Sequence, residues 1–393
     1  MTEFPTLSLS DTGETHELRW RSEAGVPPPK RVVVVDDTTT ADTAYRLACE
    51  GTALLWRGDF QNARQLLQAL NRRTERKPHK PQRQAKQPKP AAVTPLDAFN
   101  LHRQAQAQRA RTLGMLLIPL DADYAIPLRR APDVKAACAE AYGPPADDAS
   151  TPASASAVSL RELLGLIGAH EWRKKGVEIP ALNARIHPHY GVFSPVRGEY
   201  IDLVARAPLP PSVDVAFDIG TGTGVLAAVL ASRCVKRVIA TDQDPRALAC
   251  ARENLERLGY AQQVEVVEAD LFPPGRAPLV VCNPPWVPAR PSSPIEHAVF
   301  DPDSRMLRGF LGGLADHLAP GGEGWLILSD FAEHLGLRSR DMLLETIANA
   351  GLEVAARDTI RPRHPKASDP SDPLYRARAA EVTSLWRLRA KSA

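Results

Sequence analysis

The second half of the chain alternates between short apolar runs and longer segments whose apolar residues recur every three to four positions. Apolar runs bounded by glycine, proline or acidic residues predict buried strands, and the segments between them predict amphipathic helices. Strands are expected at 215–219, 236–241, 264–268, 279–282, 323–329, 352–360 and 382–388. Helices are expected near 224–233, 245–258, 304–318 and 338–350, which leaves the last two strands without a helix between them. This alternation is typical of an α/β fold with a doubly wound parallel sheet.

The first half of the chain shows these patterns less regularly. Residues 1–30 are polar and predict a loose lead-in. Strands are expected at 31–37 and 52–56, and helices at 38–49, with a threonine as its cap, and at 62–70. Residues 1–71 are therefore interpreted as a small α/β unit without a glycine loop. A degenerate copy of the later sheet is an alternative interpretation.

Residues 96–185 are expected to be mainly helical. Helices are predicted at 97–117, 133–141 and 159–175, with a strand around 120–128 and a polar spacer at 143–157. Ser159 and Glu162 have the spacing of a capping box, in which two side chains satisfy the first backbone N–H groups of a helix. The sequence thus predicts a helical region in front of a domain at 186–393.

A basic segment separates these two N-terminal regions. Between Arg72 and Pro90 the chain has eight Lys or Arg residues, one acidic residue and almost no apolar ones. Such a segment cannot bury enough surface to offset its ordering entropy, so 72–95 is expected to be a disordered linker stiffened by proline. Two functions are open: an electrostatic arm on nucleic-acid phosphates, or a solvated linker. The second is favoured because no aromatic residues are present for base stacking.

Length and composition narrow the class of protein. A chain of 393 residues predicts two or three domains, and a net charge of +3 does not by itself indicate a nucleic-acid binder. The five cysteines have no metal-like or Cys-x-x-Cys spacing, which favours reduced thiols in a cytoplasmic protein. The N-terminus lacks the pattern of a signal peptide, and the longest aliphatic run, 113–120, is too short to span a bilayer. No membrane partner is expected.

The run at 215–225 carries the strongest local signal. A predicted buried strand contains Asp218 near its end, and a turn with Gly220, Thr221, Gly222 and Gly224 leads directly into a helix. Glycine is expected at such a turn because a Cβ atom would keep a ligand away from the backbone. Dinucleotide-binding dehydrogenases need Gly-x-Gly-x-x-Gly, whereas the spacing here is Gly-x-Gly-x-Gly, which excludes that class.

Three further strand ends carry polar residues. Asp242 ends the strand after the glycine turn, where an acid can hold a ribose diol. Asp270 and Leu271 follow the next strand, and Asn283-Pro284-Pro285-Trp286 follows the one after that. Asp244-Pro245 is different: it predicts a helix N-cap followed by proline at the first helical position, and we interpret it as structural.

These motifs, in this order, resemble class I S-adenosylmethionine (SAM) methyltransferases. The resemblance implies SAM as cofactor and a Rossmann-like, seven-stranded sheet that ends in an antiparallel hairpin. It implies that the turn from Gly220 to Gly224 approaches the methionine part of SAM. It also implies that Asp218 acts on the cofactor's amino group, directly or through water, and that Asp242 accepts hydrogen bonds from the ribose hydroxyls.

The same resemblance gives roles to the other strand ends. Asp270 is expected to meet the adenine amino group and Leu271 to lie against the adenine ring. The Asn-Pro-Pro-aromatic run at 283–286 points to the branch that methylates planar nitrogens. The side-chain oxygen of Asn283 and the backbone carbonyl of Pro284 can accept hydrogen bonds from the target N–H groups. Pro284 and Pro285 stiffen the loop, and Trp286 is expected to stack on the flat target.

Residues 187–350 are similar to HemK-type glutamine N-methyltransferases. The resemblance is carried by the motifs at 283–288, 295–298, 301–308 and 318–322, in that order. Two features depart from the family: Trp286 replaces its usual Tyr, and Phe193-Ser194-Pro195 differs from its acidic motif. His187 and His189 form a His-x-His pair, but no third ligand is evident, so no metal is expected and the loop is predicted to pack on the cofactor.

The expected function is therefore SAM-dependent N-methylation of a planar amide or amino nitrogen. Protein glutamine and an RNA or DNA base both remain open as targets, because both present the same N–H geometry. The basic linker and the loop at 361–379, which contains Arg361, Arg363, His364 and Lys366, lean towards RNA or a ribosome-associated protein of the translation apparatus. Residues 96–185 would recognise the substrate. A small-molecule methyltransferase and a non-catalytic SAM-binding scaffold are the alternatives.

Overall fold

A computed structural model describes residues 5–11, 14–75, 94–145, 155–291, 296, 298–363 and 368–391. The chain divides into two compact units. Unit 1 comprises Met1–Val93 and Leu101–Glu171, and unit 2 comprises Thr94–Asn100 and Trp172–Ala393. Among the described residues, no helix combines the length and the apolar character needed to cross a bilayer.

Unit 1 is built on a six-stranded sheet with the order β1-β2-β6-β5-β4-β3. Its strands are β1 (Thr6–Asp11), β2 (Glu14–Arg21), β3 (Arg31–Val35), β4 (Thr52–Trp56), β5 (Leu116–Leu120) and β6 (Ser156–Ser159). Its helices are α1 (Ala41–Cys49), α2 (Phe60–Glu75), α4 (Lys135–Tyr142) and most of α3 (Pro95–Gly114) and α5 (Leu160–Lys175). As predicted, a threonine caps α1: the Thr40 side chain accepts a hydrogen bond from the Thr43 N–H.

Several expectations for the first half of the chain are corrected. The described residues of the segment 1–30 are not a loose lead-in, because β1 and β2 form an antiparallel hairpin and Leu7 and Trp20 are buried in the core of unit 1. The predicted strand around 120–128 lies earlier, at β5. The strand order also differs from that of the second sheet, so unit 1 is not a degenerate copy of it.

The capping box at Ser159 is absent. Ser159 ends β6, and the Glu162 carboxylate accepts hydrogen bonds from the Glu23 N–H at 2.9 Å and from the Tyr142 hydroxyl at 2.9 Å. Both partners are far from Glu162 in sequence. Tertiary packing therefore competes successfully with the local motif.

The compact units divide the chain at positions other than the predicted ones. Strands β5 and β6 come from the region expected to be a separate helical domain, yet β5 pairs with β4 and β6 pairs with β2. The first residues of α3 belong to unit 2 and the rest to unit 1. Of the predicted linker, Arg72 to Glu75 complete α2, and 76–93 lie outside the described residues.

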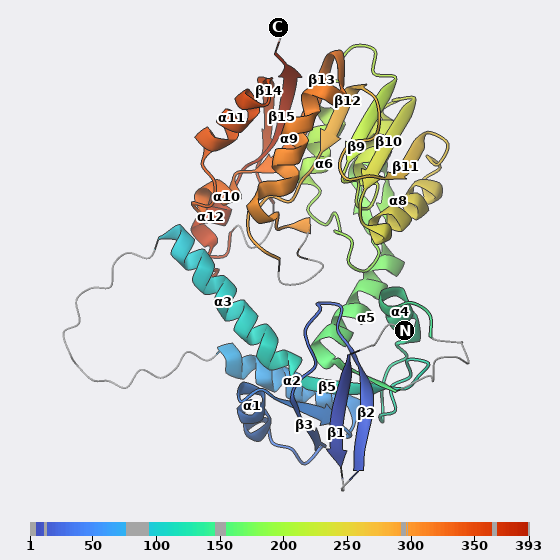
Figure 1. The fold of residues 1–393 in the computed structure, drawn as a ribbon, viewed down its shortest axis with the longest axis vertical. Helices are drawn as coiled ribbons and strands as arrows, with labels where there is room; N and C mark the ends of the chain where they lie inside the picture. The colour runs from blue at the N-terminus through green and yellow to red at the C-terminus, as the bar shows by residue number, and fades with distance from the viewer. Residues whose placement is uncertain are drawn as a thin grey trace, which may run out of the picture. The chain divides into compact units, whose positions relative to one another are not determined.

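Unit 2 contains a seven-stranded sheet with the order β11-β10-β9-β12-β13-β15-β14 (Figure 1). Its strands are β9 (Val215–Ile219), β10 (Arg237–Asp242), β11 (Val264–Glu268), β12 (Ala277–Cys282), β13 (Leu318–Ser329), β14 (Leu352–Ile360) and β15 (Thr383–Ala390). The first five are parallel, and β15 runs antiparallel to both β13 and β14. The predicted doubly wound sheet with a terminal antiparallel hairpin is confirmed.

Helices cover both faces of this sheet. They are α6 (Glu199–Arg206), α7 (Val225–Ser232), α8 (Pro245–Arg257), α9 (Arg305–His317), α10 (Phe331–His334), α11 (Arg340–Asn349) and α12 (Tyr375–Ala380). Side chains of β9 alternate between two cores: Ala216 packs with α6, α7 and α8, and Phe217 packs with α9 and α11. This alternation follows from the two-residue period of a strand, and it places the sheet between two apolar layers.

The remaining elements of unit 2 are short: the hairpin of β7 (Val177–Ile179) and β8 (Ala184–Ile186), and the 3-10 turns η1 (Pro180–Leu182) and η3 (Pro302–Ser304). The expectation of no helix between β14 and β15 is corrected by α12. Leu374 and Ala377 are buried beside Phe331 in an apolar cluster, so this helix depends on a tertiary contact that local periodicity does not reveal. His364 and Lys366 lie outside the described residues.

Candidate functional site

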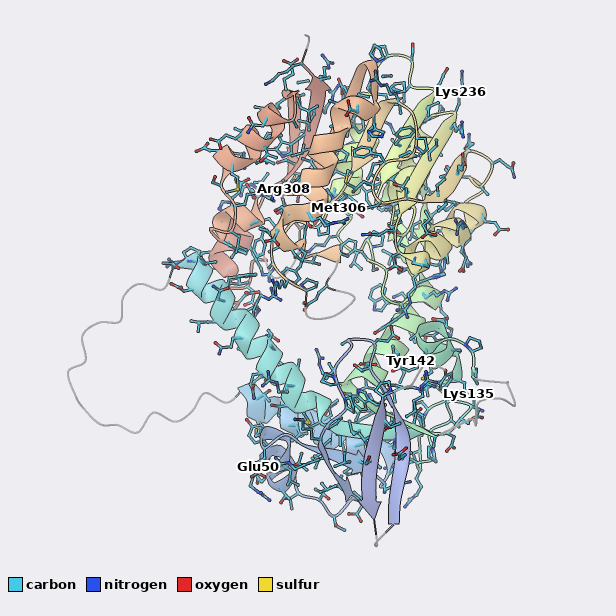
Figure 2. All side chains as sticks on the ribbon, viewed as in Figure 1. Glu50, Lys135, Tyr142, Lys236, Met306 and Arg308 are labelled. Atoms are coloured by element: carbon cyan, nitrogen blue, oxygen red, sulfur yellow. The ribbon has the colours of Figure 1, made fainter. Side chains whose placement is uncertain are left out.

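The turn after β9 contains three glycines with positive φ angles, and each has its own reason to be glycine. Gly220, Gly222 and Gly224 have φ values of 71°, 56° and 80°. A Cβ atom on Gly220 would collide with the Met306 side chain, which projects from α9 (Figure 2). A Cβ atom on Gly224 would lie 3.2 Å from the Ala251 Cα atom of α8. Only Gly222 would place a Cβ atom in open space, so its backbone is accessible to a ligand.

Asp218 supports this turn from beneath. Its side chain is buried, and Oδ2 accepts hydrogen bonds from the Thr221 hydroxyl at 2.7 Å and from the Ala227 N–H at 3.0 Å. The other oxygen, Oδ1, is buried and accepts no hydrogen bond from a described residue. Burial, with a smaller contribution from the Asp242 charge, raises the pKa of Asp218 to about 6. A buried acceptor without a partner beside an open turn fits a ligand with a cationic group.

Asp242, at the end of β10, holds the same turn from the side. Its carboxylate accepts hydrogen bonds from the Gly222 N–H and the Asp244 N–H, both at 3.0 Å. Burial raises its pKa, and the backbone hydrogen bonds oppose that effect. Each carboxylate oxygen can accept a further hydrogen bond, which suits a pair of ribose hydroxyls. As predicted, Asp244 caps α8: its side chain accepts from the Arg246 N–H, and Pro245 is the first helical residue.

Asp270 and Leu271 lie in the loop after β11. Asp270 is exposed and forms an ion pair with Arg305 at 2.8 Å. Leu271 has a φ of 76°, which is strained for a leucine, and its carbonyl accepts a 2.6 Å hydrogen bond from the Thr241 hydroxyl. Its side chain contacts α9 at Gly309. Backbone strain of this kind concentrates at functional sites, which is consistent with a binding role for this loop. Its contacts with adenine stay a prediction.

The Asn-Pro-Pro-Trp loop begins beside the glycine turn. Cys282, the last residue of β12, pairs with Ile219, the last residue of β9, so Asn283 and Gly220 begin neighbouring loops. Adjacent strands lie about 4.8 Å apart. The Asn283 Oδ1 atom accepts a hydrogen bond from the Trp286 indole N–H at 2.9 Å. The Trp286 ring packs against three apolar clusters of unit 2 and is partly buried.

Comparison with known proteins supports the resemblance to SAM methyltransferases that the sequence motifs of unit 2 indicated. Residues 183–350 match the family model described as the methyltransferase small domain. This part of unit 2 is similar to methyltransferase small domains. Proteins of this family are SAM-dependent methyltransferases, and the match supports the HemK-like class I branch.

Two curated relatives are similar over parts of unit 2. The release factor glutamine methyltransferase of Cereibacter sphaeroides is 38% identical over 131 residues, which cover 33% of this chain and 43% of the relative. The ribosomal protein L11 methyltransferase of Rhodopseudomonas palustris is 43% identical over 101 residues, which cover 25% of this chain and 32% of the relative. The chain thus spans less than half the length of each relative.

A solved methyltransferase from Pyrococcus furiosus overlaps with 58% of this chain and 98% of its own. The identity is 20% and the TM-score 0.37. Because this similarity is low, the fold of unit 2 is assigned from its strand order and from the family match.

The His-x-His pair of unit 2 packs on α8. His189 Nε2 lies 2.7 Å from Glu253 Oε2, and His187 Nδ1 lies 2.6 Å from the carbonyl oxygen of Arg173. The buried Asn254 side chain joins the His187 backbone to the Thr223 carbonyl of the glycine turn. In the described part of the chain, no group of three or more His, Cys, Asp and Glu side chains could hold a metal ion. The loop thus braces the turn.

Our sequence analysis used 301–308 only as part of a family resemblance and gave no role to Asp301 or Met306. Asp301 is buried, and its carboxylate accepts hydrogen bonds from the Met306 and Leu307 N–H groups at 3.1 Å each. It therefore fixes the start of α9 and, with it, the position of Met306 against Gly220. An acidic residue shortly before a predicted helix is a signal that could have indicated this cap.

Proposed function

We propose that this chain transfers a methyl group from SAM to the side-chain amide nitrogen of a glutamine in a protein of the translation apparatus. The observation that carries the proposal is the position of Asn283 and Trp286 beside the glycine turn. The relatives named for release factor glutamine and for ribosomal protein L11 support a protein target. A substrate of this kind would place the chain in the cytoplasm.

The described residues fit SAM. The backbone at Gly222 is open to a ligand, the Asp242 carboxylate can hold the ribose, and Asp218 supplies a buried negative charge beneath the turn. When bound, SAM supplies an electrophilic methyl group on a sulfonium centre. This chain's own residues bind and orient the two reactants, which is where most of the rate is gained for a reaction of this kind.

The target nitrogen needs help because its lone pair is delocalised into the amide. A hydrogen bond from the amide N–H to the Asn283 Oδ1 atom would raise the electron density on nitrogen. An amide oxygen has two acceptor positions, and the Trp286 N–H occupies one of them, so one remains for the substrate. Because the indole is held by packing, it keeps this oxygen in one orientation.

The proposal is tested by adding the purified chain and labelled SAM to an extract of cells that lack the protein. The extract is divided and treated with RNase or with protease, and the label in each macromolecular fraction is measured. Label that survives RNase and is lost with protease is expected. Loss with RNase would favour a nucleic-acid base, and label in the small-molecule fraction would favour a metabolite. Absence of transfer together with SAM binding would favour a non-catalytic scaffold.

A further inference from the structure

A pocket lined by arginines lies in unit 2, outside the residues that fit SAM. It has a volume of about 300 Å³. Its lining residues all lie in the segment between β14 and β15. They are Arg361, Pro362, Arg363, Ser368, Arg378, Ala379 and Glu381.

The pocket opens on the same edge of the sheet as the catalytic loop. Ile360, at the end of β14, pairs with Thr383, and Thr383 pairs with Ser329, at the end of β13. In β13, Leu326 pairs with Cys282, the residue before Asn283. The pocket and the Asn-Pro-Pro-Trp loop therefore share the carboxyl edge of the parallel strands, where loops of α/β sheets form their binding sites.

The negative charge of the one acidic residue in the pocket lining, Glu381, already has partners. Glu381 has a side chain that is 3% exposed, and it accepts a hydrogen bond from the Ser329 hydroxyl at 2.7 Å. Arg197 lies 3.9 Å from the same carboxylate. Arg378 is likewise engaged, because it pairs with Asp372 at 3.1 Å and stacks on the Phe331 ring at 5.1 Å.

Two cations of the pocket have no ion-pair partner in the described part of the chain. Arg361 and Arg363 are exposed, and their guanidinium groups form no ion pair with any residue that the structure describes. A guanidinium offers paired donors in a planar fork that matches an oxyanion. The pocket therefore combines two residues that are already engaged, Arg378 and Glu381, with two arginines whose guanidinium groups have no ion-pair partner among the described residues and can bind a negatively charged group.

We propose that this arginine pocket binds the carboxylate of an acidic side chain in the protein substrate, near the glutamine that is methylated. The proposal rests on the proposed function. Arg361 and Arg363 follow β14, which lies three strands from β12, so they are roughly 14 Å from the catalytic loop along the edge. An extended peptide rises about 3.3 Å per residue, which places the acidic residue about four residues from the target glutamine.

Nearby acids favour a protein ligand over a nucleic acid. The Glu199 carboxylate accepts a hydrogen bond from the Arg363 N–H at 2.7 Å, and Asp372 pairs with Arg378. A nucleic acid carries a charge on every phosphate and needs a continuous basic face. Acids beside Arg361 and Arg363 interrupt such a face, whereas a single carboxylate fits between these arginines.

The test compares short glutamine peptides that carry one glutamate at successive distances from the glutamine with matched peptides that carry glutamine instead. Binding to the full chain is measured by fluorescence anisotropy in the presence of S-adenosylhomocysteine. We expect one distance to improve affinity about tenfold. Arg361→Ala with Arg363→Ala should abolish this preference and leave the Kd for SAM unchanged. The control pair Lys236→Ala (Figure 2) and Arg237→Ala removes two exposed cations at the start of β10, on the opposite edge of the sheet, and should keep the preference.

Each other outcome has its own meaning. Equal binding of acidic and neutral peptides, or a preference that survives in the double arginine variant, would overturn the carboxylate site. So would arginine-dependent binding of an RNA oligonucleotide without any peptide preference. A preference that depends on the arginines, in peptides that are bound but never methylated, would support the pocket and contradict the proposed function.

Discussion

Asn283 carries the reaction in the proposed mechanism, and its contribution can be separated from cofactor binding. Asn283→Ala removes the only side-chain oxygen that we assign to the target N–H. We expect kcat for methyl transfer to fall by about a hundredfold or more, as when a preorganised polar group is lost from an active site. The Kd for SAM, measured by calorimetry, should stay within about twofold. An unchanged kcat would show that this side chain is not catalytic.

Trp286 has a positioning role that differs from stacking alone. Trp286→Phe keeps an aromatic ring but removes the N–H that is donated to Asn283 Oδ1 at 2.9 Å. With its oxygen no longer held, kcat is expected to fall about tenfold, while KM changes little. Trp172→Phe is the matched control, since Trp172 is 49% exposed. If Trp286→Phe raises KM and leaves kcat unchanged, the ring contributes only to substrate binding.

The pH dependence of SAM binding follows from Asp218. Its pKa in the folded chain is about 6, raised by burial, so the carboxylate is charged at pH 7 and mostly neutral at pH 5. A cationic ligand stabilises the charged form, so affinity is lost as the pH falls through this value. We expect the Kd for SAM to rise about tenfold between pH 7 and pH 5. Asp218→Asn should bind more weakly at pH 7 and lose most of this dependence, and an equal dependence in both proteins would contradict the assignment.

At the scale of elements, two glycines of the turn between β9 and α7 have different roles: Gly222 leaves space for a ligand, and Gly224 packs against α8. In Gly222→Ala, the alanine has to adopt a positive φ but meets no other atom, so the free energy of unfolding is expected to fall by about 1 kcal/mol. The variant should also bind SAM more weakly. Gly224→Ala adds a contact 3.2 Å from the Ala251 Cα atom, with an expected loss of about 3 kcal/mol. Urea unfolding and calorimetry measure the two effects. A variant at Gly222 that binds SAM normally would show that the open space there is not the cofactor site.

The seven strands of the large sheet and helices α7, α8, α9 and α11 of unit 2 were predictable because each depends on its own residues. The sequence places β9, β11 and β14 at their observed bounds, and the cap at Asp244 involves a partner two residues away. The prediction was wrong where distant residues decide. No local pattern indicates α12, whose buried residues pack on Phe331, or the partners of Glu162.

At the scale of the whole molecule, Phe99 shows that residues far apart in the sequence build the core of unit 2. It is buried with Val287, Phe331 and Leu374 in unit 2, although most of its helix belongs to unit 1. Phe99→Ala is expected to cost about 3 kcal/mol in the stability of unit 2. Hydrogen exchange should accelerate in α10 and α12 and stay unchanged in β3 to β5. Leu101→Ala, on the same helix but 58% exposed, is the control, and equal exchange in both variants would contradict this assignment.

The sequence by itself determined the methyltransferase fold of unit 2 and the strand ends at Asp218, Asp242 and Asn283, because strand periodicity, glycine turns and helix caps act over a few residues. Only the tertiary structure decided three other features. It joined the two N-terminal regions into one unit, oriented Asn283 through Trp286, and brought Arg361 and Arg378 to one pocket. Each of these depends on which surfaces pack together, and packing is set by the whole chain rather than by neighbouring residues.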